Sequence, residues 1–174
     1  GIVPRPRDYI FAATRRWLDP DGDGDPRDGI DGWRLDVAFC VRHPFWKAWR
    51  QFVRSINPEA YLVAEVIGTL DEEKAYLQGD EFDAIMHYDF AYACADFFIN
   101  QQRRITASQF EAQLRDLRDA YPPEVAYVLQ NLFGSHDTHR LASHTVNRNL
   151  PYRHWSDDCH WHKVENNAAY VTSK

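Results

Sequence analysis

The stretch DGWRLDVA, residues 31–38, decides the fold of this chain. Residues 32–38 are short and largely apolar, which predicts a buried strand. An amphipathic helix is expected over residues 44–56, because its apolar side chains recur at helical spacing and Asn57-Pro58 ends it. Residues 60–66 then form a second apolar run of strand length. A strand, a helix and another strand in this order are typical of parallel βα units.

The same alternation continues on both sides of this stretch. The expected helices cover residues 8–18, 70–77, 90–99 and 108–121, and the expected strands cover residues 82–86 and 125–132. Ser108 and Glu111 fit a capping box at the start of the last helix, and Pro122-Pro123 ends it. After Arg140 the chain is polar and irregular, and no element is expected there. Strands that alternate with helices indicate an α/β fold with a parallel sheet.

Composition narrows the class of protein. The length of 174 residues favours a single domain, and the 44% hydrophobic content is that of an ordinary globular protein. A net charge of −6 argues against a nucleic-acid partner, and no apolar run approaches the ~18 residues of a membrane span. An aromatic share of 14% suits either a packed core or stacking on sugar rings, and composition leaves both open.

The number and spacing of the cysteines indicate in which cellular compartment the protein is expected. Cys40, Cys94 and Cys159 are odd in number and have no paired spacing, which favours reduced thiols and a cytoplasmic location. The first residues do not resemble a secretory signal. The location otherwise stays open, since a signal would lie upstream.

Three carboxylates occupy positions where a parallel α/β barrel places its reactive groups, the C-terminal ends of strands. Asp36 and Glu65 end apolar runs, and Asp137 follows the fourth strand candidate. Ionised groups beside buried strands need a reason, because burying a charge is costly. Arg34 lies two positions before Asp36 and therefore points to the same side of the strand, where its guanidinium favours the ionised, nucleophilic carboxylate.

Each of these residues taken alone has an equally good structural interpretation. Arg34 and Asp36 would form an ion pair that only stabilises the fold, and Glu65 would cap a helix. Three such acids at the ends of successive strands favour chemistry instead. Two carboxylates that face a cleft serve glycosidic cleavage, because one attacks the anomeric carbon and the other protonates the leaving oxygen.

Three segments, DGWRLDVA (residues 31–38), AEV (64–66) and GSHDT (134–138), resemble in order the signature segments of glycoside hydrolase family 13, the α-amylase superfamily. The resemblance implies a partial (β/α)8 TIM barrel that covers roughly the fourth to seventh βα units. On this interpretation the chain is a fragment of a single catalytic barrel domain, with the barrel core in residues 1–145 and an irregular loop or tail in residues 146–174. The family's third-strand signature would precede the chain, and the eighth strand would follow it.

The resemblance assigns a role to each matching residue. It implies that Asp36 is the nucleophile, with Arg34 as its hydrogen-bond partner, and that Glu65 is the general acid/base. Asp137 would stabilise the oxocarbenium-like sugar, and His136 would bind ring hydroxyls beside it. The implied protein is a retaining α-glycoside hydrolase or transglycosylase. It would act on α-1,4/α-1,6-linked glucans or maltooligosaccharides through a covalent glycosyl-enzyme intermediate.

The amino-acid sequence of the first segment is similar to that of the neopullulanase, cyclomaltodextrinase and maltogenic-amylase branch of the family. Phe39-Cys40 replaces the Asn-Glu usual there, and Ile67 stands where a Trp is common. Both departures affect acceptor contacts, so the precise substrate and the choice between hydrolysis and transglycosylation stay open. The alternative function is a non-catalytic α-amylase-like homologue that binds sugar or a partner protein. The three intact acids count against it.

Metal sites are weak candidates. Asp19, Asp21, Asp23 and Asp25 alternate like the start of a calcium loop, but Ile30 stands where a bidentate Glu is needed. A solvated turn is the favoured interpretation, so no cofactor is expected and calcium is retained only as a weak candidate.

Two histidine-containing segments have competing interpretations. A tail cluster invites a zinc interpretation but lacks a spaced second ligand pair, so a docking or disordered loop is favoured; its members are His154, Asp157, Asp158, Cys159, His160 and His162. His87 follows the third strand candidate and has two equal interpretations, a cleft residue or a surface histidine.

Overall fold

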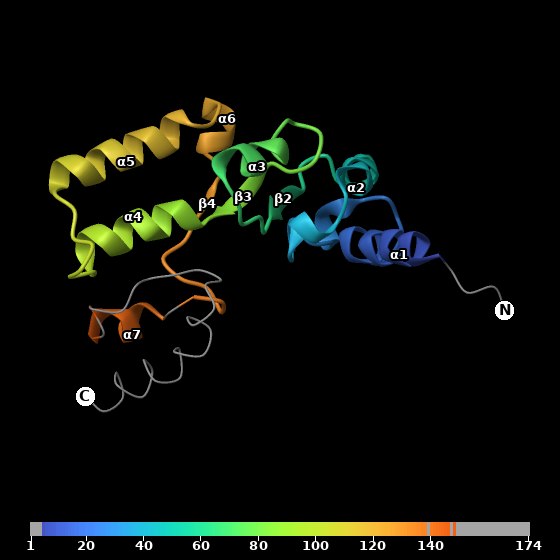
Figure 1. The fold of residues 1–174 in the computed structure, drawn as a ribbon. Coiled ribbons are helices and arrows are strands. Elements are labelled where there is room, and N and C mark those ends of the chain that lie inside the picture. Colours follow the sequence, from blue (N-terminus) through green and yellow to red (C-terminus); the bar gives the residue numbers. More distant parts are fainter. Residues whose placement is uncertain (1–4, 139, 147, 149–174) are drawn as a thin grey trace. The chain divides into compact units, whose positions relative to one another are not determined.

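The structure is a computed structural model that describes residues 5–138, 140–146 and 148 (Figure 1). The chain divides into two compact units, Gly1–Met86 and His87–Lys174. The tail cluster of histidines and Cys159 lies outside the described residues. The assignment of the whole chain to one catalytic domain stays a prediction.

The first unit consists of alternating helices and strands, as the sequence predicts. Its elements are α1 (Pro6–Leu18), β1 (Gly32–Leu35), α2 (His43–Ile56), β2 (Tyr61–Ala64), α3 (Leu70–Ala75) and β3 (Ala84–His87), with short 3-10 turns η1 (Pro26–Asp28) and η2 (Ala38–Cys40). β1 pairs with β2 and β2 with β3, both in parallel. The register sets Leu35 opposite Ala64 and Ala64 opposite Ile85. The predicted parallel sheet is therefore confirmed.

Aromatic side chains pack α1 and α2 together. The Phe11 ring lies 4.7 Å from Phe52 and 6.1 Å from Phe45, centroid to centroid. The Trp49 indole is buried and donates to Thr14 Oγ1 at 2.9 Å, which satisfies its one polar atom. In this unit, part of the high aromatic content therefore fills the core.

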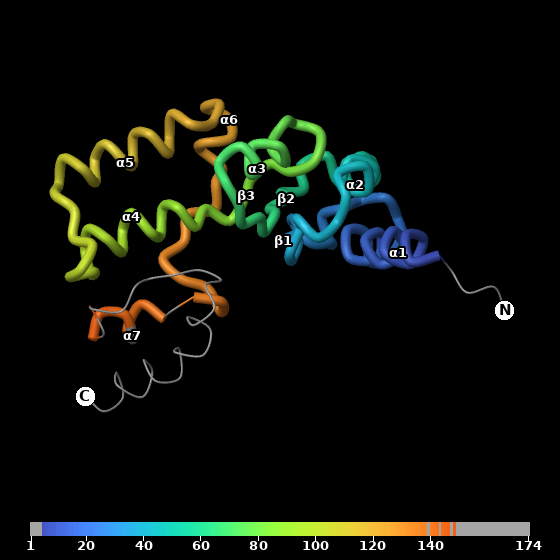
Figure 2. The backbone as a smooth tube through the Cα atoms, in the orientation of Figure 1, coloured from blue at the N-terminus to red at the C-terminus, as the bar shows by residue number. Residues whose placement is uncertain are grey.

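The second unit contains α4 (Tyr88–Phe98), α5 (Ala107–Asp119), α6 (Pro123–Ala126), β4 (Gln130–Asn131) and α7 (Leu141–Val146). Figure 2 shows the backbone running out along α4 and back along α5. The two helices contact through stacked rings, with the Phe97 and Phe110 centroids 4.5 Å apart. The part of the chain that the structure describes contains no helix long and apolar enough to cross a membrane.

Three predictions about the second unit are wrong. The capping box of α5 is Thr106 with Gln109, not Ser108 with Glu111, because the helix begins earlier. The strand expected over residues 125–132 is only the two residues of β4, because a proline in the first turn starts the helix α6 there. The helix α7 lies where no element was expected.

His87 is not a surface histidine. Its side chain is buried at 4% exposure, and its Nδ1 lies 2.9 Å from Asn131 Oδ1. The surface interpretation is therefore wrong.

The approach of β1 to β2 at the Gly32–Tyr61 pair depends on Gly32 having no side chain. A Cβ at this position would lie 2.1 Å from the backbone oxygen of Tyr61, so Gly32→Ala must push the two strands apart. We expect a loss of about 3 kcal/mol in the free energy of unfolding and a Tm lower by roughly 6–12 °C. Thermal unfolding followed by circular dichroism checks this.

Gly68→Ala is the matched control. Its Cβ would meet Glu72 Oε2 at 2.6 Å, the end of a flexible side chain that can move at the cost of its capping hydrogen bonds to Thr69, whereas Gly32 faces backbone that cannot. A Tm for Gly32→Ala that equals the Tm of this control would contradict the strand-approach argument.

Candidate active site

Two of the three predicted acids follow neighbouring parallel strands. Asp36 comes directly after β1 and Glu65 directly after β2, and the residues before them, Leu35 and Ala64, are register partners. Because the carboxyl ends of parallel strands meet at one edge of the sheet, both acids lie at that edge. The structure thus brings Asp36 and Glu65 together, as the sequence predicted.

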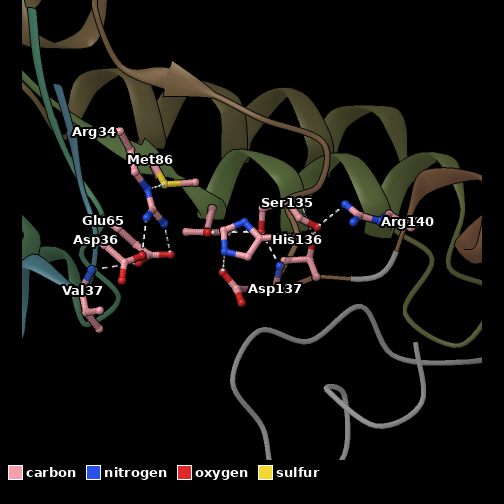
Figure 3. Close-up of polar contacts among 11 residues, drawn as sticks. Arg34, Asp36, Val37, Glu65, Met86, Ser135, His136, Asp137 and Arg140 are labelled. Carbon is pink, nitrogen blue, oxygen red and sulfur yellow. Dashed lines mark hydrogen bonds and ion pairs between the residues drawn. The ribbon is translucent and has the colours of Figure 1, made fainter. Parts of the chain in front are cut away.

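Arg34 joins the two acids. Its guanidinium forms an ion pair with Asp36 through Nη1 and with Glu65 Oε1 through Nη2, the latter at 2.7 Å (Figure 3). Its Nε lies 3.3 Å from the sulfur of Met86 on β3. Arg34 therefore contacts the ends of three adjacent strands, and one guanidinium holds both carboxylates close to each other.

The two carboxylates have different environments. The Asp36 side chain is 68% exposed, whereas that of Glu65 is 2% exposed. Glu65 Oε2 accepts the N–H of Val37 at 3.0 Å, so each of its oxygens has a separate partner. The two predicted acids therefore differ both in exposure and in the partners of their oxygens.

Backbone hydrogen bonds position Glu65 further. Its N–H donates to Leu35 O at 2.9 Å, and its carbonyl accepts from the N–H of Ala38, also at 2.9 Å. Glu65 is therefore held by both ends of the loop that carries Asp36.

Asp137 and His136 lie in the second unit, on a tight turn after β4. His136 Nε2 lies 3.0 Å from Asp137 Oδ2, and the Asp137 N–H donates to Ser135 Oγ at 3.1 Å (Figure 3). Ser135 is itself held by Thr138 Oγ1, which accepts its N–H at 2.7 Å, and by Arg140, which donates to its carbonyl at 2.9 Å. The two residues predicted to bind the sugar thus contact each other. That they converge on Asp36 and Glu65 stays a prediction.

Sequence reasoning missed two residues that contact Arg34 or Glu65. Val37 has a left-handed backbone, with φ 46° and ψ 45°, and it supplies an N–H to Glu65. Met86 supplies the sulfur beside Arg34. Neither carried a signal, because a valine gives no hint of a left-handed backbone and a methionine is usually a core residue.

The acidic loop is arranged differently from the predicted calcium set. The carboxylates of Asp19, Asp21 and Asp28 have oxygens within 4.8 Å of one another, so these three could hold a cation. Desolvation, and then the charge of Asp21, raises the pKa of Asp28. Asp25 instead forms an ion pair with Arg27. Calcium prefers six to eight oxygen ligands, and it stays only a weak candidate at this loop.

Comparison with known proteins places this arrangement in context. The family model described as the alpha amylase catalytic domain matches residues 4–163. A cyclomaltodextrinase from Bacillus sp is 41% identical over 140 residues, which cover 80% of this chain and 23% of the relative. Neopullulanase 2 from Thermoactinomyces vulgaris is 39% identical over 140 residues, again 80% of this chain and 22% of the relative. The chain thus spans less than a quarter of the length of these relatives.

The solved structures agree with the sequence relatives. The debranching enzyme of Nostoc punctiforme superposes with a TM-score of 0.67 and 34% identity, covering 81% of this chain and 30% of that structure. These likenesses confirm the predicted fold class, an α/β chain that forms part of a (β/α)8 barrel. They also confirm the resemblance to the cyclomaltodextrinase and neopullulanase branch.

Proposed function

Because the chain belongs to the alpha-amylase catalytic-domain family, we propose that this protein is a retaining α-glycoside hydrolase or transglycosylase. Its substrates are α-1,4/α-1,6-linked glucans or maltooligosaccharides. The observation that carries the proposal is the Arg34 guanidinium between an exposed Asp36 and a buried Glu65. Relatives named cyclomaltodextrinase and neopullulanase support the substrate class.

The chemistry follows from the two environments. Asp36, the exposed carboxylate, attacks the anomeric carbon and forms a glycosyl ester, while Glu65 transfers its proton to the departing glycosidic oxygen. Water then attacks the anomeric carbon of the glycosyl ester, gives its proton to Glu65 and releases the Asp36 carboxylate. A sugar acceptor in place of water gives transglycosylation. Retention requires carboxyl groups about 5–5.5 Å apart, and two carboxylates bound to one guanidinium support that short separation.

The other predicted residues serve the bound sugar. Arg34 forms an ion pair with Asp36 and orients its carboxylate for attack. The paired His136 and Asp137 offer a donor and an acceptor to ring hydroxyls, with the Asp137 charge stabilising the oxocarbenium-like transition state. No cofactor enters these steps, and calcium at the acidic loop is retained only as a weak candidate.

The test follows the anomer that the full-length protein releases first. We expect proton NMR of early products from cyclomaltodextrin, pullulan and soluble starch to show the α-anomer before mutarotation. The β-anomer first would mean inversion and would contradict the covalent intermediate. Binding of glucan in calorimetry without any turnover would favour the non-catalytic homologue instead.

A further inference from the structure

We propose that Val37 is a positioning residue for Glu65, and that its left-handed backbone is what holds the general acid in place. The inference rests on the proposed function for the role of Glu65. Among the described residues Val37 is the one non-glycine position with positive φ, at 46°. A β-branched side chain makes this conformation costly, and such strain persists only where the surroundings impose it.

The strained turn directs two successive N–H groups at one residue. The Val37 N–H donates to Glu65 Oε2 at 3.0 Å, and the Ala38 N–H donates to the Glu65 carbonyl at 2.9 Å. The dihedral angles of Val37 set the direction of the following N–H, so an ordinary extended backbone at Val37 would carry the Ala38 donor away from the Glu65 carbonyl, while the Val37 N–H is set by Asp36 before it. The side chain and the backbone of Glu65 are thus fixed by the same turn.

The surroundings supply the energy that keeps Val37 strained. The buried Ala38 accepts at its carbonyl from Trp46 Nε1 at 2.9 Å, and Val41 donates to the same carbonyl at 3.1 Å. The Cys40 N–H closes the turn on Val37 O at 2.8 Å. The loop after β1 is therefore anchored to α2 on one side and to Glu65 on the other.

Arg34 completes the arrangement from the opposite oxygen. It pairs with Glu65 Oε1, while Val37 holds Oε2, so the plane of the carboxyl group is set by two different elements of the chain. A fixed plane matters because proton transfer in the transition state depends on the direction of the donor oxygen.

The first experiment measures strain without any need for turnover. Val37→Gly removes the penalty of the left-handed region, whereas Val41→Gly replaces a valine of similar partial burial in ordinary extended backbone, φ −116°. We expect the Tm of Val37→Gly to exceed that of Val41→Gly by about 4 °C. Equal Tm values, or the reverse order, would overturn the proposal.

The second experiment measures positioning in the full-length protein. Val37→Pro removes the N–H and forces φ to about −65°, so we expect kcat to fall about 100-fold with KM nearly unchanged. Val37→Gly, which keeps the N–H and reaches the left-handed region, restores most of that loss. Glu59→Pro is the control, because it removes a backbone donor, which bonds Asn57 Oδ1 at 3.0 Å, from another loop of the same unit and touches neither Glu65 nor the turn at Val37.

The outcomes separate the two proposals. A wild-type protein that turns over no glucan defeats the proposed function. The Tm comparison of Val37→Gly with Val41→Gly then decides by itself whether the backbone at Val37 is strained. With an active wild type, a Val37→Pro variant that folds and keeps its kcat sinks the positioning role. An equal loss in Glu59→Pro would also overturn it, because the effect would then follow from any proline placed in a loop of this unit.

Discussion

Asp36→Asn is expected to lower kcat on α-glucans by a factor on the order of 10⁴ or more, as the loss of a catalytic nucleophile does. An amide cannot attack the anomeric carbon, so the glycosyl ester does not form. The effect on folding is small, because the Asp36 side chain is 68% exposed and exposed ion pairs contribute only about 0–1 kcal/mol. Initial rates on cyclomaltodextrin with the full-length protein, together with its Tm, measure both quantities.

Asp116→Asn is the matched control for this variant. Asp116 is also exposed and also lies within 3.6 Å of an arginine, Arg115, but it is on α5, outside both clusters of predicted site residues. We expect its kcat to be that of the wild type. A kcat for Asp36→Asn within about tenfold of wild type would contradict the nucleophile role of Asp36 and would mean that catalysis takes place at another site.

Glu65→Gln is expected to lower kcat on glucans by about 10³-fold, because an amide cannot donate the proton that the leaving oxygen needs. The loss should shrink strongly with α-glucosyl fluoride, since fluoride departs without protonation. A glutamine oxygen can still accept the Val37 N–H, so the loop keeps that contact. The measurement is kcat on maltooligosaccharide against kcat on the fluoride, for wild type and variant.

The control must also be a buried glutamate. Glu81 is 1% exposed, and its carboxylate lies 2.9 Å from His43 Nδ1. Another charged neighbour is Lys47, so Glu81 belongs to a different set of contacts from Asp36 and Arg34. Glu81→Gln is expected to lower the Tm but to leave the ratio of the two kcat values unchanged. If Glu65→Gln loses the same factor on both substrates, Glu65 acts in orientation or stability and not as the general acid.

Local patterns were enough to predict most of the first unit. The helix α2 ends at Ile56 because Asn57-Pro58 cannot continue it, and its aromatic residues at helical spacing mark the buried face. The strands β1 and β2 were visible as short apolar runs between helices. These features depend on neighbours in sequence, so tertiary contacts had little to change.

The second unit shows where local patterns compete. The segment Thr106 to Glu111 contains two overlapping capping boxes, and each is chemically sound. The earlier one is used, in a helix whose Phe110 ring stacks on Phe97 of α4. Residues 125–132 carry enough β-branched and apolar side chains for a strand, but Pro123 begins a helical turn first. Packing and a fixed proline φ outweighed propensity in these two places.

The sequence by itself determined which residues are the candidates for catalysis. Acids after apolar runs, and an arginine two positions before one of them, were sufficient to single out Arg34, Asp36 and Glu65. The tertiary structure alone decided how they meet, because the bridge from Arg34 to Glu65 requires the parallel register of β1 and β2. It also decided the left-handed turn at Val37, since a residue adopts a costly conformation only when contacts distant in sequence outweigh its own preference.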